Sequence, residues 1–93
     1  MVVITGASEG IGRAFARRYA AEGRDLLLIA RRSEPLARLA AELRAAHAIR
    51  VETLAQDLTA PDAPDAIDTV LAIAGAHCDL LINNAGIGLS GAF

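Results

Sequence analysis

Several residue types that signal particular classes of protein are scarce or missing in this chain of 93 residues. It has no lysine and no tryptophan, so all nine basic residues are arginines, and it has one cysteine and one tyrosine. The single cysteine, Cys78, excludes a disulfide within the chain and is typical of a reducing compartment, so we expect a cytoplasmic protein. We expect Cys78 itself to be a small buried apolar side chain near the end of a helix.

Long apolar runs and a strong net charge are also absent. The apolar run 26–30 is far too short to cross a bilayer, no segment at the N-terminus resembles a signal peptide, and the net charge is only −2. These features predict neither a membrane nor a nucleic acid as a partner. Aromatic residues make up 3% of the chain and hydrophobic residues 54%, so the core of one small domain over residues 1–93 must be aliphatic.

Residues 2–13 organise the chain, because a run of β-forming residues passes through a glycine-rich turn into a helical pattern. The glycines are Gly6, Gly10 and Gly12, and their G-x-x-x-G-x-G spacing differs from the common G-x-G-x-x-G. Glycine lets the backbone turn sharply and approach a phosphate closely, and a helix N-terminus attracts an anion. The stretch predicts a site for the pyrophosphate of a dinucleotide, with an ordinary tight turn as the alternative for this motif alone.

Strand-like and helix-like segments alternate along the chain. Apolar runs predict four parallel strands, over residues 1–5, 26–30, 51–55 and 80–82. Helical periodicity separates them; the first helix, at about 11–22, has an apolar stripe of Ile11, Phe15 and Tyr19, and the second begins after Ser33 as its N-cap. This β-α-β-α-β-α-β order predicts an α/β fold, the N-terminal half of a doubly wound, Rossmann-type parallel sheet with strand order 3-2-1-4.

The distinctive loops all follow the carboxyl ends of the predicted strands, which is the edge where open α/β sheets bind ligands. Together, Thr-Gly-x-x-x-Gly-Ile-Gly at 5–12, Asp-Leu at 57–58 and Asn-Asn-Ala-Gly at 83–86 resemble the classical short-chain dehydrogenase/reductase (SDR) family over the whole chain. The resemblance implies hydride transfer between a nicotinamide cofactor and a carbonyl or alcohol substrate. The residues that it implies in cofactor binding are Gly6, Ser8, Gly10, Ile11, Gly12, Arg31, Asp57, Leu58, Asn84, Ala85 and Gly86.

The tip of the second predicted strand bears on the choice of cofactor. NAD-binding relatives of this fold carry an acidic residue about 20 residues past the glycine loop, which accepts the ribose hydroxyls. This chain has Arg31 and Arg32 there, and an arginine can pair with a 2′-phosphate. Arg31 therefore predicts NADP(H) in preference to NAD(H), unless both arginines are solvated surface residues. Glu9, just before the second glycine, has the wrong charge for a phosphate and would weaken the preference.

The two remaining motifs have interpretations of their own. Asp57 resembles the family residue that accepts a hydrogen bond from the adenine amino group, and its alternative role is a helix cap. Asn83 and Asn84 are expected to bond neighbouring backbone and tie the fourth strand to the first. Ala85 and Gly86 would then let the cofactor ribose approach closely.

The residues that carry the chemistry of this family are missing. Its general acid/base is a tyrosine with a lysine four residues later, whereas Tyr19 is followed by Gly23 and the chain has no lysine. We therefore assign no catalytic or metal-binding residue and expect the cofactor-binding part of a longer oxidoreductase, inactive alone, weakly stable and prone to associate. A non-catalytic NADP(H)-binding module or sensor is the alternative. The substrate, the direction of reaction and the oligomeric state cannot be read from the sequence, although relatives commonly form homo-oligomers.

Overall fold

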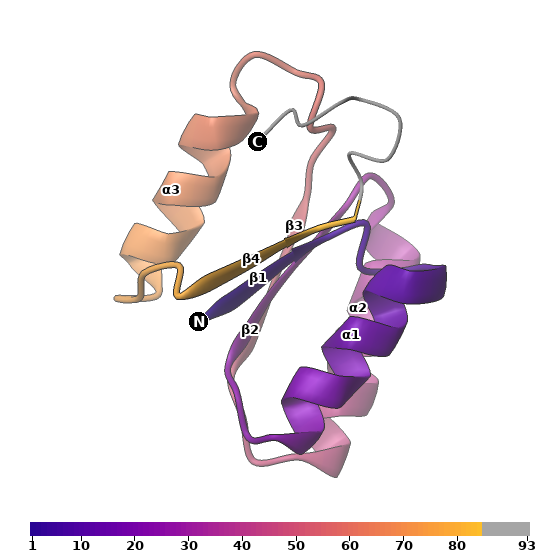
Figure 1. Ribbon diagram of the computed structural model, residues 1–93. Helices are drawn as coiled ribbons and strands as arrows, with labels where there is room; N and C mark the ends of the chain where they lie inside the picture. The colour runs from indigo at the N-terminus through magenta and orange to yellow at the C-terminus, as the bar shows by residue number, and fades with distance from the viewer. Residues whose placement is uncertain (85–93) are drawn as a thin grey trace.

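The computed structural model describes residues 1–84, which form a parallel β-sheet with helices on both faces (Figure 1). The elements are β1 (Val2–Thr5), α1 (Gly10–Ala21), β2 (Leu26–Ala30), α2 (Ser33–Ala46), β3 (Val51–Ala55), α3 (Ala63–Ile73) and β4 (Leu80–Asn83). The predicted alternation of strands and helices is confirmed. No helix in this part of the chain is both long and apolar enough to span a membrane.

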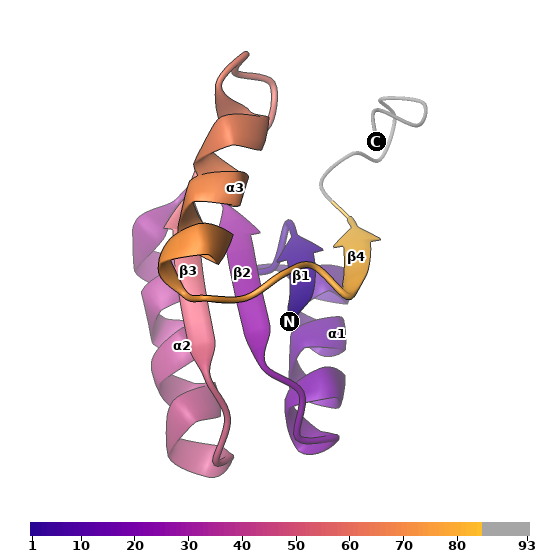
Figure 2. The same cartoon turned by 90° about the vertical axis from the view of Figure 1, so that its left-hand side faces the viewer.

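The sheet has the strand order β3-β2-β1-β4, as the sequence predicts. All neighbouring strands are parallel, with Ile4 of β1 opposite Leu28 of β2 on one side and Ile82 of β4 on the other. Figure 2 shows the four strands pointing in the same direction. Their carboxyl ends, and the loops that follow them, therefore meet at one edge of the sheet.

Two aliphatic clusters cover the two faces of the sheet. Helices α1 and α2 pack on one face, where Ala16 and Leu36 meet Ile4 and Leu28. Helix α3 packs on the opposite face, where Leu71 joins a cluster that also contains side chains of β1 and β2. All of β2 is buried because it lies between β1 and β3 with helices on both faces. This arrangement holds the central strands in place, and with them the loops at their carboxyl ends.

The buried face of α1 differs from the predicted one. Its buried residues are Gly12, Ala16 and Ala20, whereas Ile11 is 61% exposed. Phe15 and Tyr19 are partly buried, and their rings stack with centroids 6.4 Å apart. The helix lies so close to β1 and the glycine loop that only small side chains fit between them. The predicted stripe is therefore confirmed for Phe15 and Tyr19, which pack against the core, and is wrong for Ile11. Periodicity of large residues did not reveal the small buried side chains beside them.

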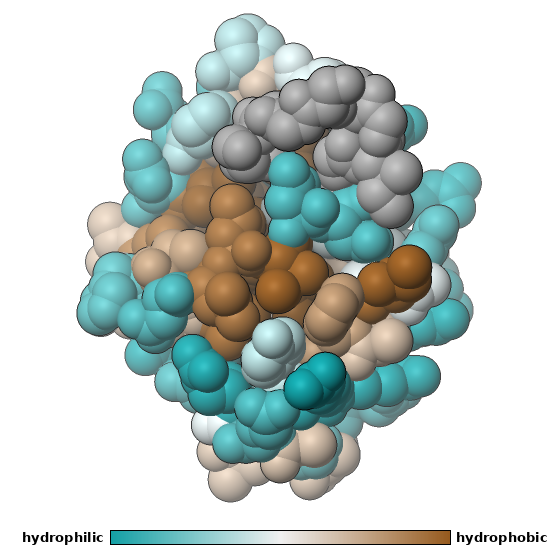
Figure 3. Space-filling view, in the orientation of Figure 1, coloured by the Kyte–Doolittle hydropathy of each residue, from teal (hydrophilic) through white to brown (hydrophobic). Residues whose placement is uncertain are grey.

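The apolar face beside α3 is only partly covered by that helix. Helix α3 lies over β3 and β2, while β1 and β4 extend beyond it (Figure 2). Figure 3 shows apolar side chains gathered on this side of the molecule, and Leu81 of β4 is 39% exposed. Leu81 pairs with the buried Val3 in the sheet, so both lie on the α3 side.

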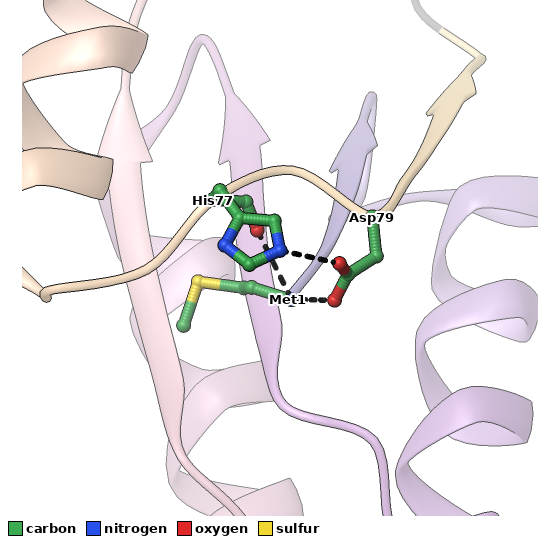
Figure 4. A network of polar contacts seen from close by, with 3 residues as sticks. All are labelled: Met1, His77 and Asp79. Carbon is green, nitrogen blue, oxygen red and sulfur yellow. Dashed lines mark hydrogen bonds and ion pairs between the residues drawn. The ribbon is translucent and has the colours of Figure 1, made fainter.

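A polar network fixes the start of β4 against the start of β1 (Figure 4). The amino group of Met1 donates hydrogen bonds to Asp79 Oδ2 at 2.5 Å and to the carbonyl of His77 at 3.2 Å. His77 Nε2 lies 2.9 Å from Asp79 Oδ1. The hydrogen bond from the Met1 amine lowers the pKa of Asp79, and the positive charges of that amine and of Arg24 act in the same direction.

Cys78, between His77 and Asp79 in this network segment, is exposed, so the prediction of a buried side chain is wrong. Cys78 lies on the segment that joins α3 to β4, outside any helix or strand. The apolar character of a cysteine side chain does not by itself determine whether that side chain is buried.

Candidate functional site

One cleft of about 750 Å³ opens at the edge where β1, β2, β3 and β4 end. Residues at the ends of these strands and in the loops that follow them line it, namely Gly6, Ser8, Glu9, Ile29, Ala30, Arg31, Arg32, Gln56, Asp57, Leu58, Thr59 and Asn84. Its volume lies within the range of roughly 300–1,000 Å³ typical of small-molecule sites. The fold thus brings together residues that are up to 78 positions apart in the sequence.

The glycine loop forms one wall of the cleft and leads directly into α1. Gly6 and Gly10 have φ angles of 62° and 49°, in the left-handed region that glycine adopts without steric cost. Helix α1 begins at Gly10, and its N-cap residue Glu9 makes no side-chain capping bond. The first N–H groups of a helix have no partner within it, so the start of α1 offers donors and a positive dipole end beside the cleft.

Gly12 has a packing role instead of a place in the cleft wall. A Cβ atom at this position would lie 2.1 Å from the carbonyl oxygen of Gly6 and 3.0 Å from Asn84 Nδ2. Only a residue without a side chain lets α1 approach the loop this closely. Gly10 and the exposed Ile11 are likewise outside the cleft lining, so three of the predicted binding residues belong to the loop and the start of α1 and do not line the cleft.

The asparagine pair at the end of β4 ties this strand to β1, as predicted. The Thr5 hydroxyl donates to Asn83 Oδ1 at 3.1 Å and to the carbonyl of Ile82 at 3.4 Å. Asn84 Nδ2 donates to the carbonyl of Gly6 at 3.5 Å, which joins β4 to the glycine loop. Asn84 therefore lines the cleft and supports its wall. The predicted residues Ala85 and Gly86 lie outside the described residues.

Both arginines at the end of β2 are exposed and line the cleft. Arg32 is the N-cap residue of α2, which begins at Ser33, so the prediction that Ser33 caps this helix is wrong. The cap makes no side-chain hydrogen bond, and Glu34 supplies a negative charge in the first turn. Arg31 and Arg32 thus present two guanidinium groups at one corner of the cleft.

Asp57, at the end of β3, is held by a local turn. Its Oδ1 accepts hydrogen bonds from the backbone N–H of Thr59 at 2.9 Å and from the Thr59 hydroxyl at 2.7 Å. These two bonds lower the pKa of Asp57, and the positive charge of Arg31 lowers it further. Helix α3 begins at Ala63 after Asp62, so Asp57 is not its cap. The alternative of a helix-capping aspartate is excluded.

The structure adds residues to the cleft that the sequence did not assign to cofactor binding. They are Ile29, Ala30, Gln56 and Thr59, together with Glu9 and Arg32, which the sequence had placed beside the phosphate site without a binding role. Each lies within two positions of a predicted residue, so extending every motif by one or two positions would have found them. Thr59 had a clearer signal, because Asp-x-Thr is a sequence in which the aspartate side chain bonds the backbone two residues on.

Comparison with known proteins gives consistent matches along this chain. Residues 1–93 match the family described as short chain dehydrogenase. Among curated proteins, a very-long-chain 3-oxoacyl-CoA reductase of Aspergillus clavatus is 40% identical over 84 residues, covering 90% of this chain and 24% of its own length. The sulfoacetaldehyde reductase 2 of Chromohalobacter salexigens is 41% identical over 90 residues, covering 97% and 35%. The chain therefore spans about a quarter to a third of these relatives.

Solved structures of two related enzymes have the same fold over most of this chain. L-sorbose reductase from Gluconobacter frateurii, complexed with NADPH and L-sorbose, superposes with a TM-score of 0.86 at 38% identity, covering 91% of this chain and 32% of that one. A short-chain dehydrogenase from Sphingobium yanoikuyae in complex with NADPH is 47% identical, with a TM-score of 0.70 over 75% of this chain and 28% of that one. The described sheet is thus a Rossmann-type sheet.

Proposed function

The chain belongs to the short chain dehydrogenase family, an oxidoreductase family, and from this premise we propose that it is the NADP(H)-binding part of such an enzyme. The proposed reaction is hydride transfer between the nicotinamide of NADP(H) and a carbonyl or alcohol substrate. The reductases to which the chain is similar support this choice over a non-catalytic module or sensor.

The donors and acceptors of the cleft fit a phosphorylated dinucleotide. The start of α1 supplies N–H groups and a positive dipole end to the pyrophosphate, and Gly6 keeps the loop free of a side chain there. Asp57 supplies an acceptor for the amino group of adenine, and Leu58 supplies apolar surface beside it. Asn84 holds the wall of the cleft through Gly6. When bound, the dinucleotide would supply the hydride carrier.

The observation that carries the NADP(H) assignment is the pair Arg31 and Arg32 in the same cleft as the glycine loop. Two guanidinium groups at the tip of β2 suit a 2′-phosphate, whereas the ribose hydroxyls of NAD need an acceptor there. A charge-assisted hydrogen bond contributes about 1.5–3 kcal/mol, which corresponds to a preference of roughly 10- to 150-fold. Glu9 lines the same cleft and opposes the phosphate charge.

The chain's own residues bind the cofactor but supply no catalytic group. Tyr19 lies on α1 and stacks on Phe15, remote from the cleft lining, and Gly23 stands where a lysine would be needed. With no lysine among the 93 residues, the proton transfer that accompanies hydride transfer must come from residues other than these. We therefore expect these 93 residues alone to be inactive as an oxidoreductase.

Binding of NADPH and NADH to Arg31 variants tests the proposal. We expect Arg31→Ala to weaken NADPH binding roughly 10- to 150-fold and to leave NADH binding unchanged. Arg18→Ala is the matched control, because Arg18 is exposed on α1, contacts Glu22 and lies outside the cleft. NMR titration suits the weak affinity expected of the isolated chain. Equal affinities of the unmodified protein for the two dinucleotides would contradict the proposal.

A further inference from the structure

Thr59 makes two hydrogen bonds to the same oxygen of Asp57. Its backbone N–H lies 2.9 Å and its hydroxyl 2.7 Å from Oδ1. Within residues 1–84, no hydrogen bond is made to Oδ2 of this carboxylate. Both residues line the cleft.

We infer that Thr59 is a positioning residue that fixes the Asp57 carboxylate, so that Oδ2 accepts a hydrogen bond from the amino group of the adenine. The inference rests on the proposed function, because it assumes that a dinucleotide occupies the cleft. Two bonds to Oδ1 restrict rotation of the carboxylate about its Cβ–Cγ bond, and an acceptor that is already oriented loses less entropy on binding. Thr59 touches Asp57 and acts through it.

The chemistry of the pair predicts selectivity for adenine over hypoxanthine. An ionised carboxylate only accepts hydrogen bonds, and the pKa of Asp57 is lowered by Thr59 and Arg31, so the group is ionised at neutral pH. Adenine presents an amino donor, whereas hypoxanthine presents a carbonyl oxygen at the same position. A fixed carboxylate therefore attracts the first base and repels the second, while a freely rotating carboxylate can turn away from the carbonyl.

The selectivity can be measured as a ratio of two dissociation constants, for NADPH and for its hypoxanthine analogue, by NMR titration of the chain. We expect the unmodified protein to prefer NADPH roughly 10- to 150-fold, the range of one charge-assisted hydrogen bond. Thr59→Val removes the hydroxyl at nearly the same volume and keeps the backbone bond, so the ratio should fall roughly 2- to 10-fold. Thr59→Ser keeps the hydroxyl and should restore the ratio.

A double-mutant cycle with Asp57→Ala separates positioning from a general structural role. If Thr59 acts through Asp57, Thr59→Val changes the ratio in the native background and leaves it unchanged when Asp57 is alanine. A change of equal size in both backgrounds would overturn the inference. Thr59→Ala provides the same comparison if the valine variant fails to fold.

The outcomes also distinguish this inference from the proposed function. An unmodified protein that binds neither dinucleotide would refute the proposed function, and with it the inference. A protein that binds NADPH with the same preference over the hypoxanthine analogue before and after Thr59→Val would refute the inference alone. A fall in the ratio that serine restores and that disappears without Asp57 would establish it.

Discussion

Replacement of Gly12 by alanine tests the closest contact in the site, between α1 and the glycine loop. The added Cβ would lie 2.1 Å from the carbonyl oxygen and 2.8 Å from the carbonyl carbon of Gly6, and 3.0 Å from Asn84 Nδ2. The first two contacts are with backbone, so no side-chain rotation can relieve them. Either α1 must move away from the sheet or the loop must change conformation.

The expected loss of stability follows from two opposing effects. Overpacking a buried position costs about 1–3 kcal/mol and occasionally more, and backbone contacts this short place Gly12→Ala at the upper end. Alanine is favoured over glycine inside a helix by at most about 1 kcal/mol, which offsets part of this cost. We therefore expect the free energy of unfolding to fall by roughly 2 kcal/mol.

Urea unfolding followed by circular dichroism measures this loss, and Gly10→Ala is the control. Gly10 has a φ of 49° with open space around it, so its substitution strains the backbone without a clash. The side-chain amide signal of Asn84 should shift in Gly12→Ala and stay unchanged in Gly10→Ala. If Gly12→Ala is as stable as the unmodified protein and leaves the Asn84 signal in place, the close approach of α1 to the loop is refuted.

Three further predictions concern other parts of the chain. The pKa of Asp79 is lower in the folded state than its unfolded value of about 3.9. The stabilising contribution of this carboxylate is therefore present above that pH and is lost as pH falls through the folded pKa. As pH is lowered from about 5 to 2, the urea midpoint should fall less steeply in Asp79→Asn than in the unmodified protein, and equal slopes would contradict this. Glu9→Gln removes a negative charge from the cleft and should strengthen NADPH binding more than NADH binding in the same titrations, whereas equal gains would exclude an effect on the 2′-phosphate. Leu81→Ser should reduce the concentration-dependent association that we expect of the apolar face beside α3, measured by analytical ultracentrifugation, and unchanged association would locate it elsewhere.

The sequence was sufficient for the strands and their order, because buried parallel strands have continuous apolar runs and right-handed crossovers restrict the topology. It also placed Arg31, Asp57 and Asn84 at one edge, since loops that follow parallel strands must meet there. The role of Asn84 could be predicted because an asparagine next to a strand end has few partners other than the neighbouring backbone.

Details that depend on distances between elements could not be predicted. The buried face of α1 is set by how closely the helix approaches the loop, which favours Gly12 and Ala16 over the larger Ile11. The exposure of Cys78 depends on the path of a connecting segment that carries no periodicity. Thr59 could be predicted only in part. Its bond to Asp57 follows from the local Asp-x-Thr sequence, whereas its place in the cleft depends on the whole sheet.

NMR titration of the isotopically labelled chain with NADPH, followed through its backbone amides, tests most directly whether the cleft binds this cofactor. We expect saturable shifts for Gly6, Arg31 and Asp57 at the cleft, and none for Asp25 and Asp79 at the opposite edge of the sheet. The shift of Arg31 should be smaller with NADH at the same concentration. An absence of saturable shifts, or shifts confined to the opposite edge, would contradict the proposal that this cleft binds NADP(H).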